Sequence, residues 1–124
     1  MARKKVDIKW MNRPEKHNYP AACSYLSLLF DEADAQTWVK KLKRAPMSEF
    51  KAKDIFRASG LSLLGVSNSH VKSDQQKILD GKELSPLLLK RDAAHRRVII
   101  ADGYHRLCAI YSYHEDAVIH CKIV

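Results

Sequence analysis

The sequence predicts one small α/β (α+β) domain in which helices cover a mixed sheet, and three observations lead to that prediction. The chain has 124 residues, about the commonest length for a single domain. Residues 1–73 show mainly helical spacing of apolar side chains, whereas residues 74–124 contain short strand-like runs around one helical pattern. A sheet covered by helices is the simplest way to bury the apolar faces of such elements.

Two elements are expected before residue 31. Residues 6–10 alternate apolar and polar side chains, which predicts a short half-buried strand. Pro20 suits the first position of a helix, and the apolar side chains after it recur at helical spacing. We therefore expect a buried helix that contains Ala22, Cys23, Leu26, Leu29 and Phe30.

Two further helices are expected between residues 31 and 60. Asp31 is placed to cap a helix with acids in its first turn and bases in its last, and Pro46 stops this helix. Ser48 is placed to cap another helix, which ends at Gly60 because glycine tolerates the left-handed conformation at a helix terminus.

The pattern changes after residue 73. Ser73 and Gln76 have the spacing of a capping box and Gly81 is a natural terminator, so a short helix is expected between them. Strand-like runs follow at residues 87–89, 98–100 and 118–124, with a helical pattern between the last two. The second part is therefore predicted to be β-β-α-β.

The composition is that of a globular protein. Hydrophobic residues make up 46% of the chain and charged residues 29%, so a packed core is expected. The longest apolar runs are far shorter than the stretch of about 20 residues that crosses a bilayer, so no membrane-spanning segment is expected. No apolar signal segment follows the basic N-terminus, which predicts a cytoplasmic location. The odd count of three cysteines favours reduced thiols over a disulfide framework.

The chain is basic, with a net charge of +8, and basic clusters attract nucleic acids through counterion release. Residues 1–60 contain 13 Lys and Arg against 7 acids, and residues 61–124 contain 9 against 7. The stretches 40–44 and 51–57 are the candidates for contact with a nucleic-acid backbone. A solvated helix face is the favoured explanation of these stretches, and the first lies at the end of a helix, where cations are expected in any case.

The strongest functional signal is the turn Asp102-Gly103-Tyr104-His105-Arg106. A buried strand ends here and a helix begins directly, so unpaired amides at the helix start are expected to point at an anion. Gly103 allows a sharp turn and a close approach of the ligand to the backbone. The guanidinium of Arg106 suits phosphate oxygens, and His105 adds a donor whose charge changes near neutral pH. A phosphate or a carboxylate is the expected ligand.

A structural explanation of the same turn stays open. Asp102 has the position of an ordinary helix cap, and Arg106 has that of a surface residue paired with an acid. A single histidine is more often structural than catalytic. No catalytic residue is therefore assigned.

These residues resemble a known family. Residues 103–109, Gly-Tyr-His-Arg-Leu-Cys-Ala, fit the G-x-x-R-x-x-A pattern of the ParB/sulfiredoxin superfamily. Residues 84–89, Leu-Ser-Pro-Leu-Leu-Leu, are similar to that family's proline-containing entry into a strand. The order of elements over residues 74–124 also agrees, so the resemblance covers about two-fifths of the chain.

The resemblance implies a ParB-like domain that binds the phosphates of CTP, ATP or ADP at residues 102–106, with Mg²⁺ as the candidate metal ion. Ser85, at the neighbouring strand entrance, is the further candidate for phosphate contact. Sulfiredoxins have their reactive cysteine at the position of Tyr104, and a phenol cannot perform thiolate chemistry, so sulfiredoxin activity is not expected. Partition-type ParB proteins continue into a helix-turn-helix domain, whereas this chain ends at Val124, so partition binding is not expected either.

A metal site of the protein's own is not expected. The four candidate ligands do not share one face of the predicted helix and strand. Two of them are better placed as small apolar side chains in the core. These candidates are Cys108, His114, His120 and Cys121, of which the two cysteines are assigned to the core.

Three functions remain as hypotheses. The first is phosphate or nucleotide binding, with hydrolysis, phosphate transfer and a switch left open. The second is a DNA- or RNA-associated protein, or a nuclease, that uses the basic first half. The third is a noncatalytic partner protein. The sequence indicates neither the nucleotide, nor an enzymatic activity, nor an oligomeric state.

Overall fold

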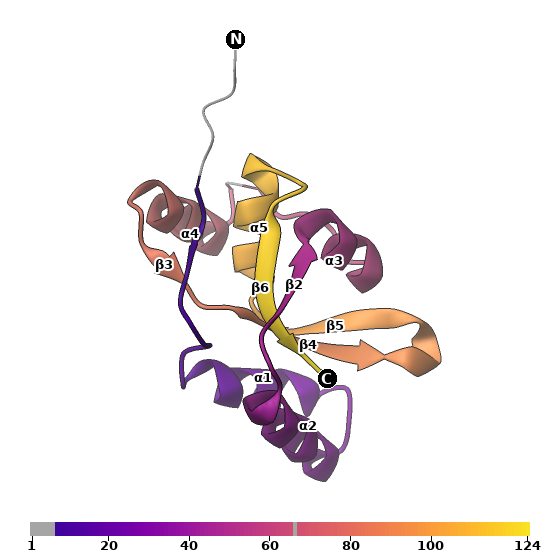
Figure 1. Ribbon diagram of the computed structural model, residues 1–124. Coiled ribbons are helices and arrows are strands. Elements are labelled where there is room, and N and C mark those ends of the chain that lie inside the picture. Colours follow the sequence, from indigo (N-terminus) through magenta and orange to yellow (C-terminus); the bar gives the residue numbers. More distant parts are fainter. Residues whose placement is uncertain (1–6, 66) are drawn as a thin grey trace.

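A four-stranded sheet forms the centre of the computed structural model, which describes residues 7–65 and 67–124 (Figure 1). The strand order is β2-β6-β4-β5. β4 and β6 run parallel, and the other neighbours are antiparallel, so the sheet is mixed as the sequence predicts. The strands are β2 (Ser48–Lys51), β4 (Leu87–Asp92), β5 (Arg97–Asp102) and β6 (Val118–Ile123).

Five α-helices of the described chain cover the sheet on both faces. α1 and α2 lie at the lower end of the view in Figure 1, and α3, α4 and α5 lie at the upper end. A short 3₁₀ turn at Ala93–His95 joins β4 to β5. The helices are α1 (Asn18–Leu26), α2 (Glu32–Arg44), α3 (Ala52–Ser59), α4 (Ser69–Leu79) and α5 (Tyr104–Tyr113).

The first half of β4, Leu87-Leu88-Leu89, is apolar at every position. Successive side chains of a strand point to opposite faces, and both faces of this strand are covered. Leu87 and Leu89 pack with α3, α4 and α5, whereas Leu88 packs with α1 and α2. All three side chains are at most 1% exposed.

A second, two-stranded sheet joins the beginning of the described chain to the entrance of β4. β1 (Lys9–Trp10) pairs parallel with β3 (Glu83–Leu84), and the amide of Met11 donates to the carbonyl of Leu84 at 2.9 Å. The strand predicted at residues 6–10 is therefore confirmed only for its last two residues, and Val6 lies outside the described chain.

The prediction that a helix begins at Ser48 is wrong. Ser48–Lys51 is strand β2, which pairs with β6, and α3 begins at Ala52. The amides of Ala52 and Lys53 donate to the carbonyls of Ala117 and Glu115, both at 2.9 Å, so the loop before β6 supplies acceptors for the first amides of the helix. The predicted end at Gly60 is confirmed, because its φ of 67° is left-handed.

The capping box predicted at Ser73 and Gln76 is also wrong. α4 begins at Ser69, and the side chain of Asn68 accepts hydrogen bonds from the amides of His70 and Val71 at 3.0 and 3.2 Å. Asn68 thus satisfies two amides that a helix N-terminus leaves unpaired.

The bounds of α1 differ from the prediction as well. Pro20 is the third residue of the helix, which starts at Asn18, and not the first residue as predicted. The helix ends at Leu26, so Leu29, which is 46% exposed, is not part of it. Within residues 7–65 and 67–124, no helix combines the length and apolar character needed to span a bilayer.

Candidate functional site

The predicted strand–glycine–helix turn is present at residues 102–104. β5 ends at Asp102, Gly103 has a φ of 106°, and α5 starts at Tyr104. A Cβ atom on Gly103 would lie 2.6 Å from Cγ of Leu87, which is fully buried. Both the backbone conformation and the contact with the core therefore require glycine here.

The N-terminus of α5 has no side-chain cap. Asp102, which the structural explanation assigned as a cap, does not cap the helix. The first backbone hydrogen bond of α5 runs from the amide of Leu107 to the carbonyl of Gly103 at 3.0 Å. The preceding amides have no intrahelical acceptor, and they carry the positive end of the helix dipole.

A polar cavity of about 250 Å³ lies at this helix start. α4 supplies the wall opposite residues 102–106, and the two helices pack against each other. Its volume is below the range of about 300–1,000 Å³ typical of sites that enclose drug-sized ligands, so it fits a phosphate group better than a whole nucleotide. The lining residues from α4 are His70, Ser73, Asp74 and Lys77.

Positive groups line this cavity from both helices. The imidazole rings of His70 and His105 are 4.9 Å apart, so the two side chains present donors side by side. Nζ of Lys77 lies 3.7 Å from a carboxylate oxygen of Asp74, which is a loose ion pair and leaves the lysine free to turn to a ligand. An anion is therefore compatible with the cavity, although Asp74 and Asp102 oppose its charge.

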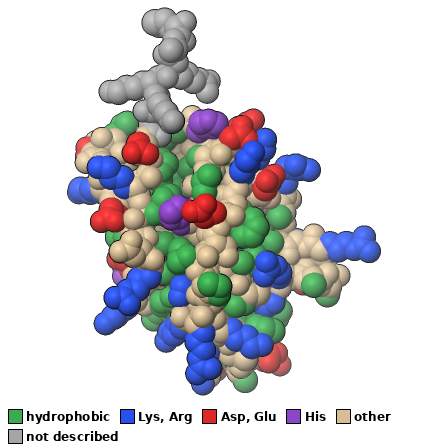
Figure 2. Space-filling model, in the orientation of Figure 1, with side chains coloured by type: hydrophobic (Ala, Val, Ile, Leu, Met, Phe, Trp, Pro, Cys, Tyr) green, Lys and Arg blue, Asp and Glu red, His purple; other side chains and the backbone are tan. Residues whose placement is uncertain are grey.

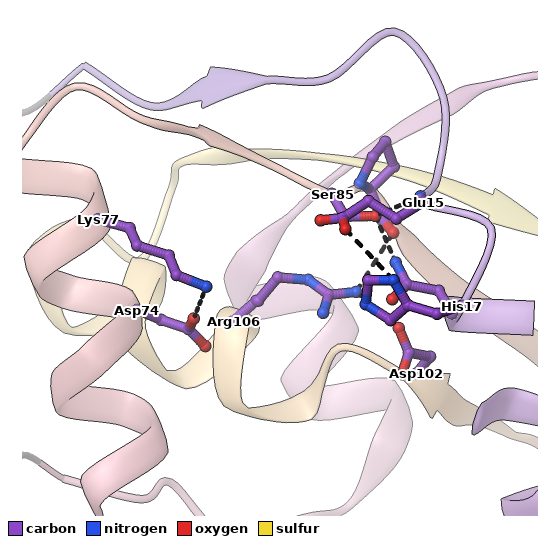
Figure 3. Close-up of polar contacts among 9 residues, drawn as sticks. Glu15, His17, Asp74, Lys77, Ser85, Asp102 and Arg106 are labelled. Carbon is purple, nitrogen blue, oxygen red and sulfur yellow. Dashed lines mark hydrogen bonds and ion pairs between the residues drawn. The ribbon is translucent and has the colours of Figure 1, made fainter.

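Arg106 is held by an ion pair inside the turn. Its Nη2 donates to a carboxylate oxygen of Asp102 at 2.8 Å and to the carbonyl of Pro86 at 3.4 Å. Figure 3 shows the side chain directed toward Asp102 and Ser85 and away from Lys77. The guanidinium charge is thus compensated, as the structural explanation expects, and a phosphate would have to share Arg106 with Asp102.

One donor of Arg106 nevertheless lacks a partner. Its Nε is buried and has no hydrogen-bond acceptor among the residues that the structure describes. An unpaired buried donor is costly, and it is the kind of group that a bound anion would satisfy. The side chains of Arg106 and Asp102 are 17% and 16% exposed, so this pair is partly open to solvent.

The hydroxyl oxygen of Ser85 is already engaged in hydrogen bonds within the protein. It accepts hydrogen bonds from the amide of Glu15, at 3.0 Å, and from the side-chain amide of Asn18. Ser85 and Asn18 are both only 3% exposed (Figure 3). These bonds join the segment before α1 to the entrance of β4, and only the hydroxyl proton remains for a ligand.

Tyr104 faces a loop of the same protein. Its hydroxyl donates to the carbonyl of Ser62, and the amide of Leu64 donates to Sγ of Cys108 at 3.5 Å. Burial, together with the neighbouring Cys108, raises the pKa of Tyr104 above its usual value. The phenol is therefore a neutral anchor for residues 61–65 near neutral pH.

The two cysteines assigned to the core are indeed there. Cys108 and Cys121 are fully buried, and burial raises the pKa of Cys121 to about 12. His120 stacks on Trp10 with ring centroids 5.2 Å apart. In the described part of the chain, no three His, Cys, Asp or Glu side chains gather as metal ligands.

The contribution of α4 could not be foreseen from the sequence. Residues 70–77 carry no motif, and they reach the turn only because α4 packs on α5. No family model matches the chain, and neither the curated proteins nor the solved structures contain a significant match. Any function has therefore to be inferred from the protein's own residues.

Proposed function

We propose that this protein binds the phosphate groups of a nucleotide, CTP, ATP or ADP, at the start of α5. The observation that supports the proposal is the uncapped helix N-terminus after Gly103, which lines a polar cavity together with Lys77. Helix N-termini bind phosphate because their free amides and the helix dipole both favour an anion.

The size of the cavity limits which part of the nucleotide it would hold. A space of about 250 Å³ accommodates the terminal phosphates and leaves the sugar and base at the surface. Asp74 and Asp102 would repel a bare phosphate, so we propose that Mg²⁺ accompanies the nucleotide. Mg²⁺ is commonly held by one or two carboxylates together with substrate phosphates. Asp74 and Asp102 would supply the carboxylates here, and the nucleotide would supply the phosphates.

The order of elements from α4 to β6 also supports the proposal. α4, Pro86 at the entrance to β4, β5, the glycine turn, α5 and β6 follow one another. This is the order that the resemblance to ParB/sulfiredoxin-like domains implies, and we propose that relationship on this basis. The free cysteines suit a reducing compartment, so we also propose a cytoplasmic location. A reaction is not assigned, since no side chain of the cavity is placed as a nucleophile or a base.

Equilibrium titration with CTP, ATP, ADP and inorganic phosphate, each with Mg²⁺, tests the proposal. Lys77→Ala removes a cation from the cavity, whereas Lys72→Ala removes an exposed lysine from the same helix that does not line it. We expect Lys77→Ala to weaken nucleotide binding about tenfold, equivalent to about 1.4 kcal/mol, and Lys72→Ala to have no effect. Absence of binding by all four ligands would overturn the proposal.

Arg106→Ala tests the arginine separately. If a phosphate shares its guanidinium with Asp102, this substitution should weaken binding at least as much as Lys77→Ala, because charged hydrogen bonds contribute more than a nearby charge. Tight binding that is unaffected by Arg106→Ala would remove the arginine from the site while leaving the helix amides in place.

A further inference from the structure

Four cations gather on the face of the sheet that α1 and α2 cover. Nζ atoms of Lys90 and Lys41 lie 4.0 and 4.8 Å from the centre of the Trp38 ring. Nζ atoms of Lys43 and Lys122 lie 5.7 and 6.0 Å from the centre of the Tyr19 ring. We call Lys41, Lys43, Lys90 and Lys122 the cationic cluster; they come from α2, β4 and β6.

Two members of the cationic cluster are buried without an acidic partner. Lys90 and Lys122 are each 9% exposed. Lys122 donates to the carbonyl of Lys43 at 3.0 Å, and Lys90 donates to the carbonyl of Arg91. Among the described residues, no carboxylate forms an ion pair with any of the four.

The electrostatic environment of Lys90 shows that these charges act on one another. Burial is the main cause of a lowered pKa of Lys90, and Lys41 and Arg91 lower it further. Asp92 opposes the shift, but its carboxylate is already paired with His95 and Arg97 at 2.9 and 3.1 Å. The cluster therefore carries positive charge that the surrounding protein does not neutralise.

The other basic stretch of the chain is different. Lys51 and Lys53 lie 3.8 and 2.6 Å from a carboxylate oxygen of Asp116, and Arg57 pairs with Asp54 at 3.8 Å. Of the two stretches that the sequence singled out, only residues 40–44 keep unpaired charge within the described chain. Lys90 and Lys122 from the second half of the sequence add to that charge.

We propose that the cationic cluster, with Lys40 and Arg44 beside it on α2, binds the phosphate backbone of a nucleic acid. Exposed Lys41 and Lys43 release counterions when they meet closely spaced phosphates, and Lys90 and Lys122, buried on the same face, add to the positive potential. The rings of Trp38 and Tyr19 are already contacted by lysines, so bases cannot stack on them as in sequence-tolerant single-strand sites. The cluster contacts backbone phosphates and not base edges, and it binds duplexes without sequence preference.

The position of the exposed apolar side chains favours a nucleic acid over an anionic membrane. Leu28 and Leu29, which are 82% and 46% exposed, precede the start of α2. Lys41 and Lys43 lie at its other end, and a helix of 13 residues is about 20 Å long. The exposed apolar side chains and the cations are therefore separated along the helix and do not form one membrane-binding surface. Figure 2 shows Lys and Arg side chains over the lower part of this view, where α1 and α2 lie.

Fluorescence anisotropy with a labelled duplex of random sequence, at several salt concentrations, tests this surface. The informative variant is Lys41→Gln/Lys43→Gln, and the matched control is Lys51→Gln/Lys53→Gln, which removes the same charge from lysines paired with Asp116. We expect the first variant to raise Kd about tenfold and to lower the slope of log K against log salt by about 2. The control should change Kd less than about threefold.

Three results would overturn the proposal. The duplex is not bound at low salt, the two double variants lose affinity equally, or vesicles with anionic lipids bind more tightly than the duplex. None of the four replaced lysines belongs to the buried core, and a cooperative melting transition verifies that each variant is folded. The outcome is independent of the proposed nucleotide site, because Lys77→Ala should leave duplex binding unchanged.

Discussion

Replacing Gly103 by alanine tests the geometry on which the proposed phosphate site depends. The added Cβ atom would lie 2.6 Å from Cγ of Leu87 and 2.9 Å from Nη2 of Arg106. Leu87 is fully buried and cannot move without disturbing the core, whereas the guanidinium is the far end of a flexible side chain. The φ of 106° is an additional obstacle, because alanine rarely adopts it.

The cost has three parts. A left-handed conformation costs an alanine about 1–2 kcal/mol, and an overpacked core costs about 1–3 kcal/mol. Replacing glycine by alanine also reduces the conformational freedom of the unfolded chain, which stabilises the folded state by about 0.4–1 kcal/mol. We therefore expect Gly103→Ala to lower the free energy of unfolding by about 3 kcal/mol. For a chain of 124 residues this corresponds to a fall in Tm of about 10 °C.

Thermal and urea denaturation measure this loss, and Gly60→Ala is the matched control. Gly60 also has a left-handed φ, 67°, but its added Cβ atom would meet nothing within 4 Å. We expect Gly60→Ala to lower the free energy of unfolding only by the backbone contribution, about 1 kcal/mol. Equal losses in the two variants would refute the close contact between the turn and Leu87.

Four further perturbations have defined outcomes. Asn68→Ala should lower the free energy of unfolding by about 1 kcal/mol in urea denaturation, because α4 loses its cap, and an unchanged midpoint would contradict that role. Iodoacetamide at pH 8 should add one label to the folded protein, at half-exposed Cys23, and a second adduct before denaturant is added would be inconsistent with the buried thiols. Burial raises the pKa of Cys121 from 9.0 to about 12, so stability should fall as pH rises through that interval, as melting at increasing pH would show. The hydrogen bond from Lys53 lowers the pKa of Asp116 below 3.8, so its stabilising effect is present above about pH 4 and is lost as pH falls through the lowered pKa. Asp116→Asn should therefore lower Tm at pH 7 and leave it unchanged near pH 2, and an equal effect at both values would exclude the ion pair as the cause.

The predictions that succeeded rest on strong local signals. The turn at Gly103 was predictable because a buried run of β-branched residues meets a glycine and then a helical pattern. The left-handed end of α3 at Gly60 was predictable for the same reason, since glycine has a conformation that few other residues adopt.

The prediction at Ser48 failed because the local sequence contains a helix signal and no strand signal. A serine before a run with helical spacing can cap a helix, whereas Phe50 is the only apolar side chain of Ser48–Lys51, so apolar and polar residues do not alternate there. Pairing with β6 makes this segment a strand, and β6 lies some 70 residues away in sequence. A local pattern cannot contain the hydrogen bonds of a partner so distant.

The local sequence by itself determined the covalent order of strand, glycine and helix at residues 97–113, and the apolar run of β4 that is buried on both faces. Only the tertiary structure decided what surrounds that turn. Packing of α4 on α5 brought Lys77 and His70 to the helix start, and the ion pair with Asp102 oriented Arg106. Pairing of β4 with β6 likewise placed Lys90 and Lys122 beside α2. The physical reason is that the helix-start geometry arises within a few residues, whereas the charges around it come from segments that meet only when the core closes.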